Sequence, residues 1–191
     1  QLLSKGIDFE QLDLIVVPDS DLMLNIPDFR SYERAFQQLY QLAGRSGRRK
    51  QRGKVLVQSY QPNHEVFQHV KDEKYIELAE KELVQRKEYH YPPFYRLIEI
   101  HLKHKDQQTV FNAGKYFENI ISRRLESRMM GPLTPSVARV KDRYIQQFII
   151  KMHRENDNPS KIKEYLLWAS KELIQAPGFG GITVEFDVDP N

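Results

Sequence analysis

The sequence predicts two folded parts in one chain, the end of an α/β lobe followed by a small α+β domain. Residues 1–60 follow the order strand, helix, strand, and both strands are short apolar runs. Pro92 and Pro93 then end a helical stretch. Beyond these prolines, residues 95–188 follow the order β-α-β-β-α-β, which predicts a ferredoxin-like split unit.

The first part is predicted to place one helix between two strands. Residues 12–17 are an apolar run that Pro18 closes, and residues 54–59 form a second run. Short continuous apolar runs are typical of buried strands in a parallel sheet. Asp28 or Ser31 can cap the intervening helix. Its apolar face is predicted to comprise Phe36, Leu39, Tyr40 and Ala43.

A helical linker is predicted to separate the two parts. Pro62 opens this stretch, and charges of both signs follow at helical spacing, as in Glu77 and Lys81. Two prolines close it before Phe94. We therefore divide the chain into a lobe (1–61), a helical linker (62–92) and a C-terminal domain (93–191).

The C-terminal domain is predicted to contain two helices and four strands. Strands are expected at 96–102, 137–140, 144–152 and 182–188, with a turn at Lys141 and Asp142 between the second and third. Gly131, Pro132 and Pro135 predict a loop before this hairpin. The first helix, 107–126, has a predicted core stripe of Val110, Phe111, Tyr116, Phe117, Ile120 and Ile121. The second begins at Pro159, with a predicted apolar face of Ile162, Tyr165, Leu166, Trp168, Ala169, Leu173 and Ile174.

Composition excludes several classes of site and compartment. The chain has no cysteine, so it holds neither a disulfide nor a thiolate metal site. Its six histidines lack metal-site spacing, so we expect no metal ligands. No apolar run has the length of a membrane span, and the first residues do not resemble a signal peptide. We therefore expect a soluble cytoplasmic protein with no membrane partner. Because the chain begins with Gln1 and not with methionine, we expect it to be a piece of a longer protein.

The densest basic segment begins at Arg45 and Arg48, near the end of the first predicted helix. Arginines three residues apart share a helix face, and a guanidinium fork matches phosphate oxygens. Gly44 and Gly47 permit close approach of the backbone. The pair can therefore stabilise a transferred phosphoryl group. It can equally be a basic helix end that contacts phosphates or water, because similar segments occur in unrelated proteins.

Further basic residues could contact nucleic acid at two places. The first is a continuation of the same segment, Arg49, Lys50, Arg52 and Lys54. The second is the predicted hairpin, with Arg139, Lys141 and Arg143 next to Tyr144 and Phe148. Cations beside aromatic rings can hold a nucleic-acid strand. The alternatives are a solvated loop at the first place, and a polar turn above two core aromatics at the second.

Taken in order, these motifs resemble the primosomal protein N′ (PriA) family of bacterial replication-restart helicases. Gln41-Leu-Ala-Gly-Arg-Ser-Gly-Arg48 is similar to the arginine-finger motif of superfamily 2 helicases, and residues 1–9 are similar to helicase motif V. Pro27-Asp-Phe-Arg-Ser-Tyr-Glu-Arg34 resembles a segment that is more specific to the family. The match is completed by residues 58–64, by Arg86-Lys87 with the Tyr91-Pro-Pro-Phe94 entry to the last domain, by Gly131-Pro132, by the basic hairpin and by the closing Asp187-Val-Asp-Pro190. Two departures are Ser46, where alanine is usual, and Gln146, which replaces a basic residue after the hairpin turn.

The resemblance implies that residues 1–61 are the end of a RecA-like second helicase lobe. Arg45 and Arg48 would then be the catalytic arginines. ATP contacts would come from the motif V and VI residues, Lys5, Gly6, Asp8, Gln41, Gly44 and Gly47. DNA contacts would come from Arg49, Lys50, Arg52, Arg139, Lys141 and Arg143. Lys161 and Tyr165 are the candidates for contact with single-stranded-DNA-binding protein, although the alternative is an exposed charge and a half-buried core tyrosine.

For the full-length protein, the resemblance implies an ATP-dependent 3′-to-5′ DNA helicase that recognises stalled replication forks and reloads the replicative helicase. Its expected partners are branched and single-stranded DNA, single-stranded-DNA-binding protein, other primosome proteins and the replicative helicase, in the bacterial cytoplasm at the nucleoid. ATP and Mg²⁺ would be its cofactors, and zinc would sit in a cysteine-rich insert outside this chain. The chain has no G-x-x-x-x-G-K-[ST] loop, so we expect it to be inactive by itself.

Two alternatives remain at this point. The chain can be a stand-alone nucleic-acid-binding module with a degenerate helicase remnant. It can also be an RNA-binding protein, because split β-α-β-β-α-β domains include RNA readers. The absence of an aromatic RNP-like strand counts against the second alternative.

Overall fold

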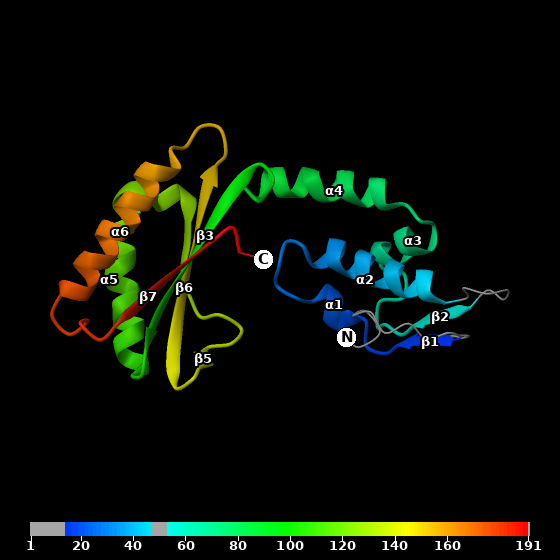
Figure 1. Ribbon diagram of the computed structural model, residues 1–191, viewed down its shortest axis with the longest axis horizontal. Helices are drawn as coiled ribbons and strands as arrows, with labels where there is room; N and C mark the ends of the chain where they lie inside the picture. The colour runs from blue at the N-terminus through cyan, green and yellow to red at the C-terminus, as the bar shows by residue number, and fades with distance from the viewer. Residues whose placement is uncertain (1–13, 47–52, 191) are drawn as a thin grey trace. The chain divides into compact units, whose positions relative to one another are not determined.

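The computed structural model describes residues 14–46 and 53–190, which form two compact units (Figure 1). The division falls between Arg86 and Lys87, inside the helix α4 (Tyr75–Glu88). Each unit has its own sheet and its own buried core, so the chain is a mixed α/β structure with two sheets.

The first unit contains a two-stranded parallel sheet. The strand β1 (Leu14–Val17) pairs in register with β2 (Lys54–Val57), and the connection passes through the short helix α1 (Asp21–Leu24) and the longer helix α2 (Ser31–Arg45). Ile15 and Val17 are buried against Leu39 of α2. The predicted strand, helix and strand are therefore present, and parallel pairing requires such a crossover connection.

The prediction that β1 is a fully buried strand is wrong for the part of the chain that the structure describes. Side chains alternate across a strand, and only Ile15 and Val17 point to the α2 side. Leu14 and Val16 on the other face are 55% and 50% exposed. Leu56 of β2 is exposed as well. The sheet thus has one covered face and one apolar uncovered face.

Two further helices belong to the first unit, in the segment predicted to be a linker. Val66 of α3 (Glu65–Lys71) and Leu78 of α4 are fully buried with Ala35 and Phe36 of α2. His64 caps α3, because its Nδ1 accepts a hydrogen bond from the backbone N–H of Val66 at 3.3 Å. These helices pack as part of the unit that contains α2.

The second unit is a five-stranded antiparallel sheet with two long helices. Along the sheet the order is β4-β6-β3-β7, and β5 pairs with β6. The elements in chain order are β3 (Tyr95–His104), α5 (Gln107–Leu125), the 3-10 turn η1 (Glu126–Arg128), β4 (Met129–Leu133), β5 (Arg139–Val140), β6 (Arg143–His153), α6 (Pro159–Gln175) and β7 (Thr183–Val188).

The helices α5 and α6 lie side by side on one face of this sheet (Figure 1). The core between them and the sheet contains Phe117 of α5 and Phe148 of β6, whose rings meet edge to face with centroids 5.3 Å apart. Ile100 of β3 and Leu173 of α6 are also fully buried there. The alternation of β3 and β6 places every second residue in this core.

One strand was not predicted. Gly131 and Pro132 were expected to lie in a loop, but they belong to β4, where Met129 and Met130 pair with Ile150 and Ile149 of β6. Gly131 makes this possible, because its φ of 128° is rare for other residues and a Cβ there would lie 2.7 Å from the carbonyl oxygen of Gln147. The register shifts after this glycine, so β4 continues beyond it as an irregular strand.

The predicted core stripes are also partly wrong. Phe111 and Tyr116 of α5 are 43% and 40% exposed, and Trp168 of α6 is 46% exposed. A helix packed on a flat sheet buries a stripe narrower than the set of apolar positions in these sequences. The second unit therefore carries aromatic side chains on its surface.

Candidate functional site

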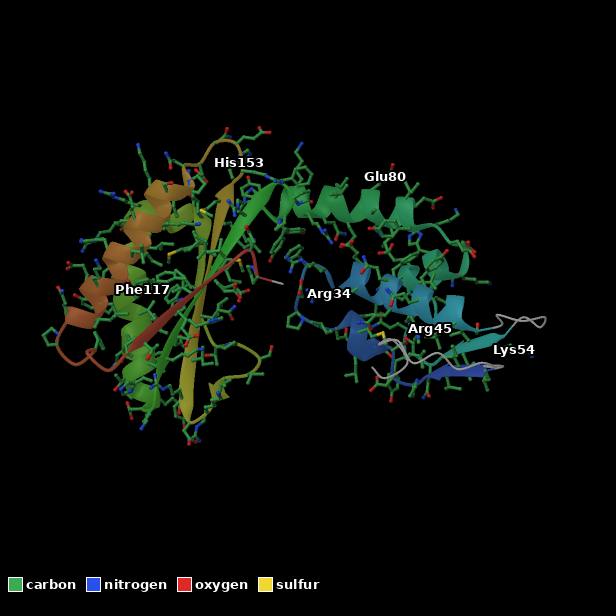
Figure 2. The ribbon with its side chains drawn as sticks, viewed as in Figure 1. Arg34, Arg45, Lys54, Glu80, Phe117 and His153 are labelled. Atoms are coloured by element: carbon green, nitrogen blue, oxygen red, sulfur yellow. The ribbon has the colours of Figure 1, made fainter. Side chains whose placement is uncertain are left out.

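The C-terminal end of α2 carries three of the predicted nucleotide-site residues, Gln41, Gly44 and Arg45 (Figure 2). Gln41 and Gly44 are exposed, and a Cβ at Gly44 would meet no atom within 4 Å. The surface beside Gly44 is therefore open within the described structure. Ser46 ends the helix, because its Oγ donates a hydrogen bond to the carbonyl oxygen of Ala43 at 2.9 Å. Ser46, the departure from the family's alanine, thus has a local structural role.

Several predicted site residues lie outside the described ranges 14–46 and 53–190. They are the motif V residues Lys5, Gly6 and Asp8, the motif VI residues Gly47 and Arg48, and the basic residues Arg49, Lys50 and Arg52. Lys54, next in the basic segment, is the first residue of β2 and is exposed (Figure 2). The roles of all these residues stay predictions.

The segment Pro27–Arg34, singled out in the sequence without a role, forms a set of polar contacts at the start of α2. Asp28 accepts hydrogen bonds from the backbone N–H of Arg30 and from Nη1 of Arg34, both at 2.8 Å. Glu33 accepts one from Nη2 of Arg86 at 2.8 Å and one from the hydroxyl of Tyr75 at 3.0 Å. The Arg86 guanidinium also lies 5.2 Å from the centre of the Phe29 ring. The contacts that Arg86 and Tyr75 make with Glu33 and Phe29 hold α4 against the start of α2.

The charges of this cluster shift two pKa values in opposite directions. Burial alone would raise the pKa of Glu33, but the hydrogen bonds from Arg86 and Tyr75 outweigh it and lower that pKa. Glu82 is only 8% exposed, and its burial raises its pKa despite the opposing charge of Arg86. The Glu33–Arg86 pair is not predictable from the sequence, because residues 53 positions apart give no periodic signal.

The predicted basic hairpin is present, and its turn lies at Lys141 and Asp142 as predicted. Both turn residues have positive φ, 46° and 64°, which is the pattern of a two-residue type I′ turn. Arg139 pairs with Asp142 at 3.0 Å, and its guanidinium lies 5.1 Å from the centre of the Tyr144 ring. Lys141 is exposed at the turn.

The third basic residue of the hairpin, Arg143, has a different setting. Its Nη1 donates a hydrogen bond to Oγ1 of Thr183 on β7, which ties two strands across β3. Gln146, where the resemblance leads us to expect a basic residue, is buried and donates a hydrogen bond to Oγ1 of Thr134 at 3.0 Å. A longer basic side chain at this position would have to leave the protein interior.

The two predicted partner-contact residues lie on the first two turns of α6. Lys161 is exposed just after the Asn158 cap, whose Oδ1 accepts from two backbone N–H groups of α6. Tyr165 is half-buried, and its hydroxyl donates a hydrogen bond to the carbonyl oxygen of Ile120 at 2.6 Å. The Tyr165 ring stacks on the Trp168 ring, with the ring centres 5.5 Å apart, and the Arg124 guanidinium lies 4.9 Å from the centre of the Tyr165 ring. Arg124 comes from the neighbouring helix α5, so the spacing of residues along α6 does not predict this contact.

The described residues contain neither a metal-binding group nor a membrane-spanning helix. Within ranges 14–46 and 53–190, no group of three or more histidine, aspartate or glutamate residues is arranged to hold a metal ion. Among the helices in the described part, none is long and apolar enough to cross a membrane.

Comparisons with known proteins give the family. The family of primosomal protein N C-terminal domains matches residues 87–191, which correspond to the second unit. The Replication restart protein PriA of Bacillus subtilis is 31% identical over 192 residues, and that of Synechocystis is 34% identical over 194 residues. Both alignments cover 100% of this chain, and they cover 23% and 22% of the relatives.

The second unit is thus a primosomal protein N C-terminal domain. The chain belongs to the PriA family of replication restart proteins. It spans less than a quarter of the length of these two relatives, so most of the sequence of a PriA protein has no counterpart in it.

Proposed function

We propose that this chain is the C-terminal part of an ATP-dependent 3′-to-5′ DNA helicase that recognises stalled replication forks and reloads the replicative helicase. The observation that carries the proposal is that the sequence similarity to the relatives extends over the whole chain. Relatives named as replication restart proteins align with the whole chain, including the first unit with α2, and not only with the C-terminal domain. This extent disfavours the alternative of a stand-alone nucleic-acid-binding module.

In this proposal, the end of α2 completes an ATP site whose phosphate-binding loop lies on another part of the full-length protein. Arg45 and Arg48 stabilise the charge that develops on the transferred phosphoryl group, because guanidinium stays protonated and offers paired donors. Gln41 and the exposed Gly44 line the approach to that group. ATP and Mg²⁺ supply the phosphoryl chemistry when bound, and residues outside this chain hold them. Lys5, Gly6 and Asp8 link nucleotide state to DNA.

The basic residues contact the DNA backbone. Arg139 and Lys141 are the hairpin residues best placed for this, since both side chains are largely exposed. Arg143 contributes through its charge, while its hydrogen bond to Thr183 holds the hairpin against β7. Arg49, Lys50 and Arg52 extend the contact on the first unit. Such contacts give affinity that does not depend on sequence and falls with salt.

The protein partners follow from the proposed family role. Lys161, with Tyr165 beside it, contacts the acidic tail of single-stranded-DNA-binding protein. Other primosome proteins and the replicative helicase bind the full-length protein, which acts at the bacterial nucleoid in the cytoplasm. Its zinc, if the cysteine-rich insert is present, lies outside these residues, because the chain has no cysteine.

A salt-series anisotropy titration of the 191-residue chain tests the DNA-binding part of the proposal. Forked DNA, the matching duplex and the single strand are compared at several salt concentrations. We expect tighter and salt-sensitive binding to the fork or the single strand. Equal or absent binding to all three would contradict a role for this chain in recognising branched DNA.

A further inference from the structure

A groove of about 670 Å³ lies in the second unit between the start of α5 and the β5–β6 hairpin. Phe111 of α5 lines one side of this groove, and Tyr144 of β6 lines another. Its volume is within the range of about 300–1,000 Å³ that is usual for ligand sites. All of its lining residues belong to the C-terminal domain, so the groove is complete within one unit.

A cationic side chain lies over each of the two aromatic rings that line the groove. The ammonium of Lys115 lies 4.6 Å from the centre of the Phe111 ring, and the Arg139 guanidinium lies 5.1 Å from the centre of the Tyr144 ring. Phe111 is 43% exposed, although it occupies an apolar position of α5. The groove therefore combines aromatic ring surface, exposed at Phe111, with a cation next to each of its two rings, which matches a planar group attached to an anionic backbone.

Uncharged polar groups line the interior of the groove. Gln107 and Gln108 contribute from the first turn of α5, and Gln146 contributes from β6, where it also donates to Thr134. Amide groups both donate and accept hydrogen bonds, so they suit the edges of a nucleobase. The start of α5 is already capped, since Asp106 accepts hydrogen bonds from both the backbone N–H and the hydroxyl of Thr109.

We propose that this groove receives an unpaired base of single-stranded DNA, with Phe111 and Tyr144 as its stacking surfaces and Arg139 and Lys115 beside the adjoining phosphates. The inference rests on the proposed DNA-binding function and specifies how it is achieved. It assigns a role to Phe111, which the comparison of motifs did not single out. It also makes the hairpin one wall of a base site and not only a set of phosphate contacts.

The lining favours a base over an acidic peptide. Asp106 is part of the groove, and hydrogen bonds from Thr109 keep its pKa below the ordinary value, so it is ionised at neutral pH. An ionised carboxylate repels the carboxylates of an acidic peptide, whereas a neutral base carries no charge to be repelled. The anionic part of the ligand therefore lies at the cationic rim, outside the groove.

Two oligonucleotides of equal length and charge separate base binding from phosphate binding. One is oligo-dT, and the other carries abasic sites in place of all bases. Affinity of the 191-residue chain for each is measured at one salt concentration. We expect the abasic strand to bind at least about tenfold more weakly, since base–aromatic stacking contributes strongly to single-strand affinity. Equal affinities would overturn the proposed base site and leave salt-dependent DNA binding intact.

The variant Phe111→Leu assigns the effect to the groove. Leucine keeps an apolar side chain at this exposed position, so the fold is preserved. Because the ring is lost, the penalty for the abasic strand, which is its loss of affinity relative to oligo-dT, should become smaller. The matched control is Tyr116→Leu, which removes a similarly exposed ring of α5 that does not line the groove. We expect this control to keep the full penalty. A penalty unchanged in Phe111→Leu would overturn the assignment.

An acidic peptide serves as the competing ligand. We expect this peptide not to displace oligo-dT from the groove. The difference in oligo-dT affinity between the parent and Phe111→Leu should therefore persist when the peptide is present. Displacement of oligo-dT that disappears in Phe111→Leu would show that the groove is a peptide site and would overturn the proposal. Absence of binding to any DNA would contradict the proposed function as well as the base site.

Discussion

At the scale of single residues, Arg86 is the cation on which the polar contacts of the first unit converge. It lies 2.8 Å from Glu33 and 3.7 Å from Glu82, and its side chain is 13% exposed. Its Nε is buried and has no hydrogen-bond partner among the residues that the structure describes. A buried cation in this setting depends on Glu33, the carboxylate that accepts its hydrogen bond, because an unpaired buried charge is strongly unfavourable.

Removal of Glu33 tests this dependence. We expect Glu33→Ala to lower the free energy of unfolding of the first unit by about 1.5–3 kcal/mol, since it deletes charged hydrogen bonds and leaves Arg86 poorly paired. Hydrogen exchange of α2 and α4 amides measures that free energy for this unit. The control Arg34→Ala breaks a more exposed pair with Asp28 and should cost less than about 1 kcal/mol. Equal losses in both variants would contradict the special role of Arg86.

The raised pKa of Glu82 gives a prediction with a definite sign. A carboxyl whose pKa is raised by folding stabilises fully below its unfolded pKa, and this contribution is lost as pH rises through the folded value. We therefore expect Glu82→Gln to be more stable than the parent at pH 7, with the difference vanishing below about pH 4. Urea unfolding across this pH range measures the difference. A Glu82→Gln variant less stable than the parent at pH 7 would contradict the account.

The hairpin cation Lys141 gives a prediction about binding. We expect Lys141→Ala to weaken binding to all single-stranded DNA sequences alike and to reduce the slope of log K against log salt by about 1. Anisotropy titrations at several salt concentrations measure the slope. Lys171→Ala removes the same charge from an exposed position on α6 and should leave the slope unchanged. Identical slopes for the parent and Lys141→Ala would show that the hairpin turn does not contact the DNA backbone.

At the scale of elements, the β5–β6 turn is a strained connection. Type I′ turns need positive φ at both central residues and favour asparagine and glycine there, but this chain has Lys141 and Asp142. A residue with a Cβ in this conformation is less stable than glycine. The turn keeps a cation at its tip in spite of this strain.

Substitutions at Asp142 test the strain. We expect Asp142→Gly to be more stable than the parent and Asp142→Ala to be less stable than the parent. The free energies of unfolding of the two variants should differ by about 1 kcal/mol or more. Both variants lose the same ion pair with Arg139, so the pair does not affect their difference. Urea unfolding followed by fluorescence of Trp168, the single tryptophan, reports on the second unit. Alanine equal to glycine would show that the turn stores no strain.

Most elements could be predicted from periodicity, because each helix and long strand repeats its own pattern. The exceptions depend on contacts distant in sequence. The strand β4 carries Gly131 and Pro132, which locally indicate a loop, and pairing with β6 decides otherwise. Similarly, spacing alone placed Phe111 in the core, whereas the groove beside the hairpin leaves it exposed.

The candidate site was predictable only in part. Arg45 and the hairpin cations could be named because adjacent residues form the motif. The contact of Arg86 with Glu33 of the family-specific segment could not be predicted, since only the packing of α4 on α2 brings the two residues together. The same is true of Arg124, which reaches Tyr165 from another helix.

At the scale of the whole molecule, one continuous helix joins the two units. The helix α4 contributes Tyr75, Leu78 and Arg86 to contacts of the first unit, and its last residues belong to the second. In the proposed function, the first unit carries arginines of an ATP site and the second carries a DNA-binding surface. We propose that these two activities belong to one protein, of which this chain is the C-terminal part.

ATP hydrolysis by the full-length protein with and without DNA tests that claim most directly. We predict that Arg45→Ala and Arg48→Ala each lower the DNA-stimulated kcat by about 10³-fold or more, with little change in DNA affinity. Arg123→Ala, which removes an exposed arginine of α5, is the control and should hydrolyse ATP like the parent. Undiminished DNA-stimulated hydrolysis in both Arg45→Ala and Arg48→Ala would contradict the account.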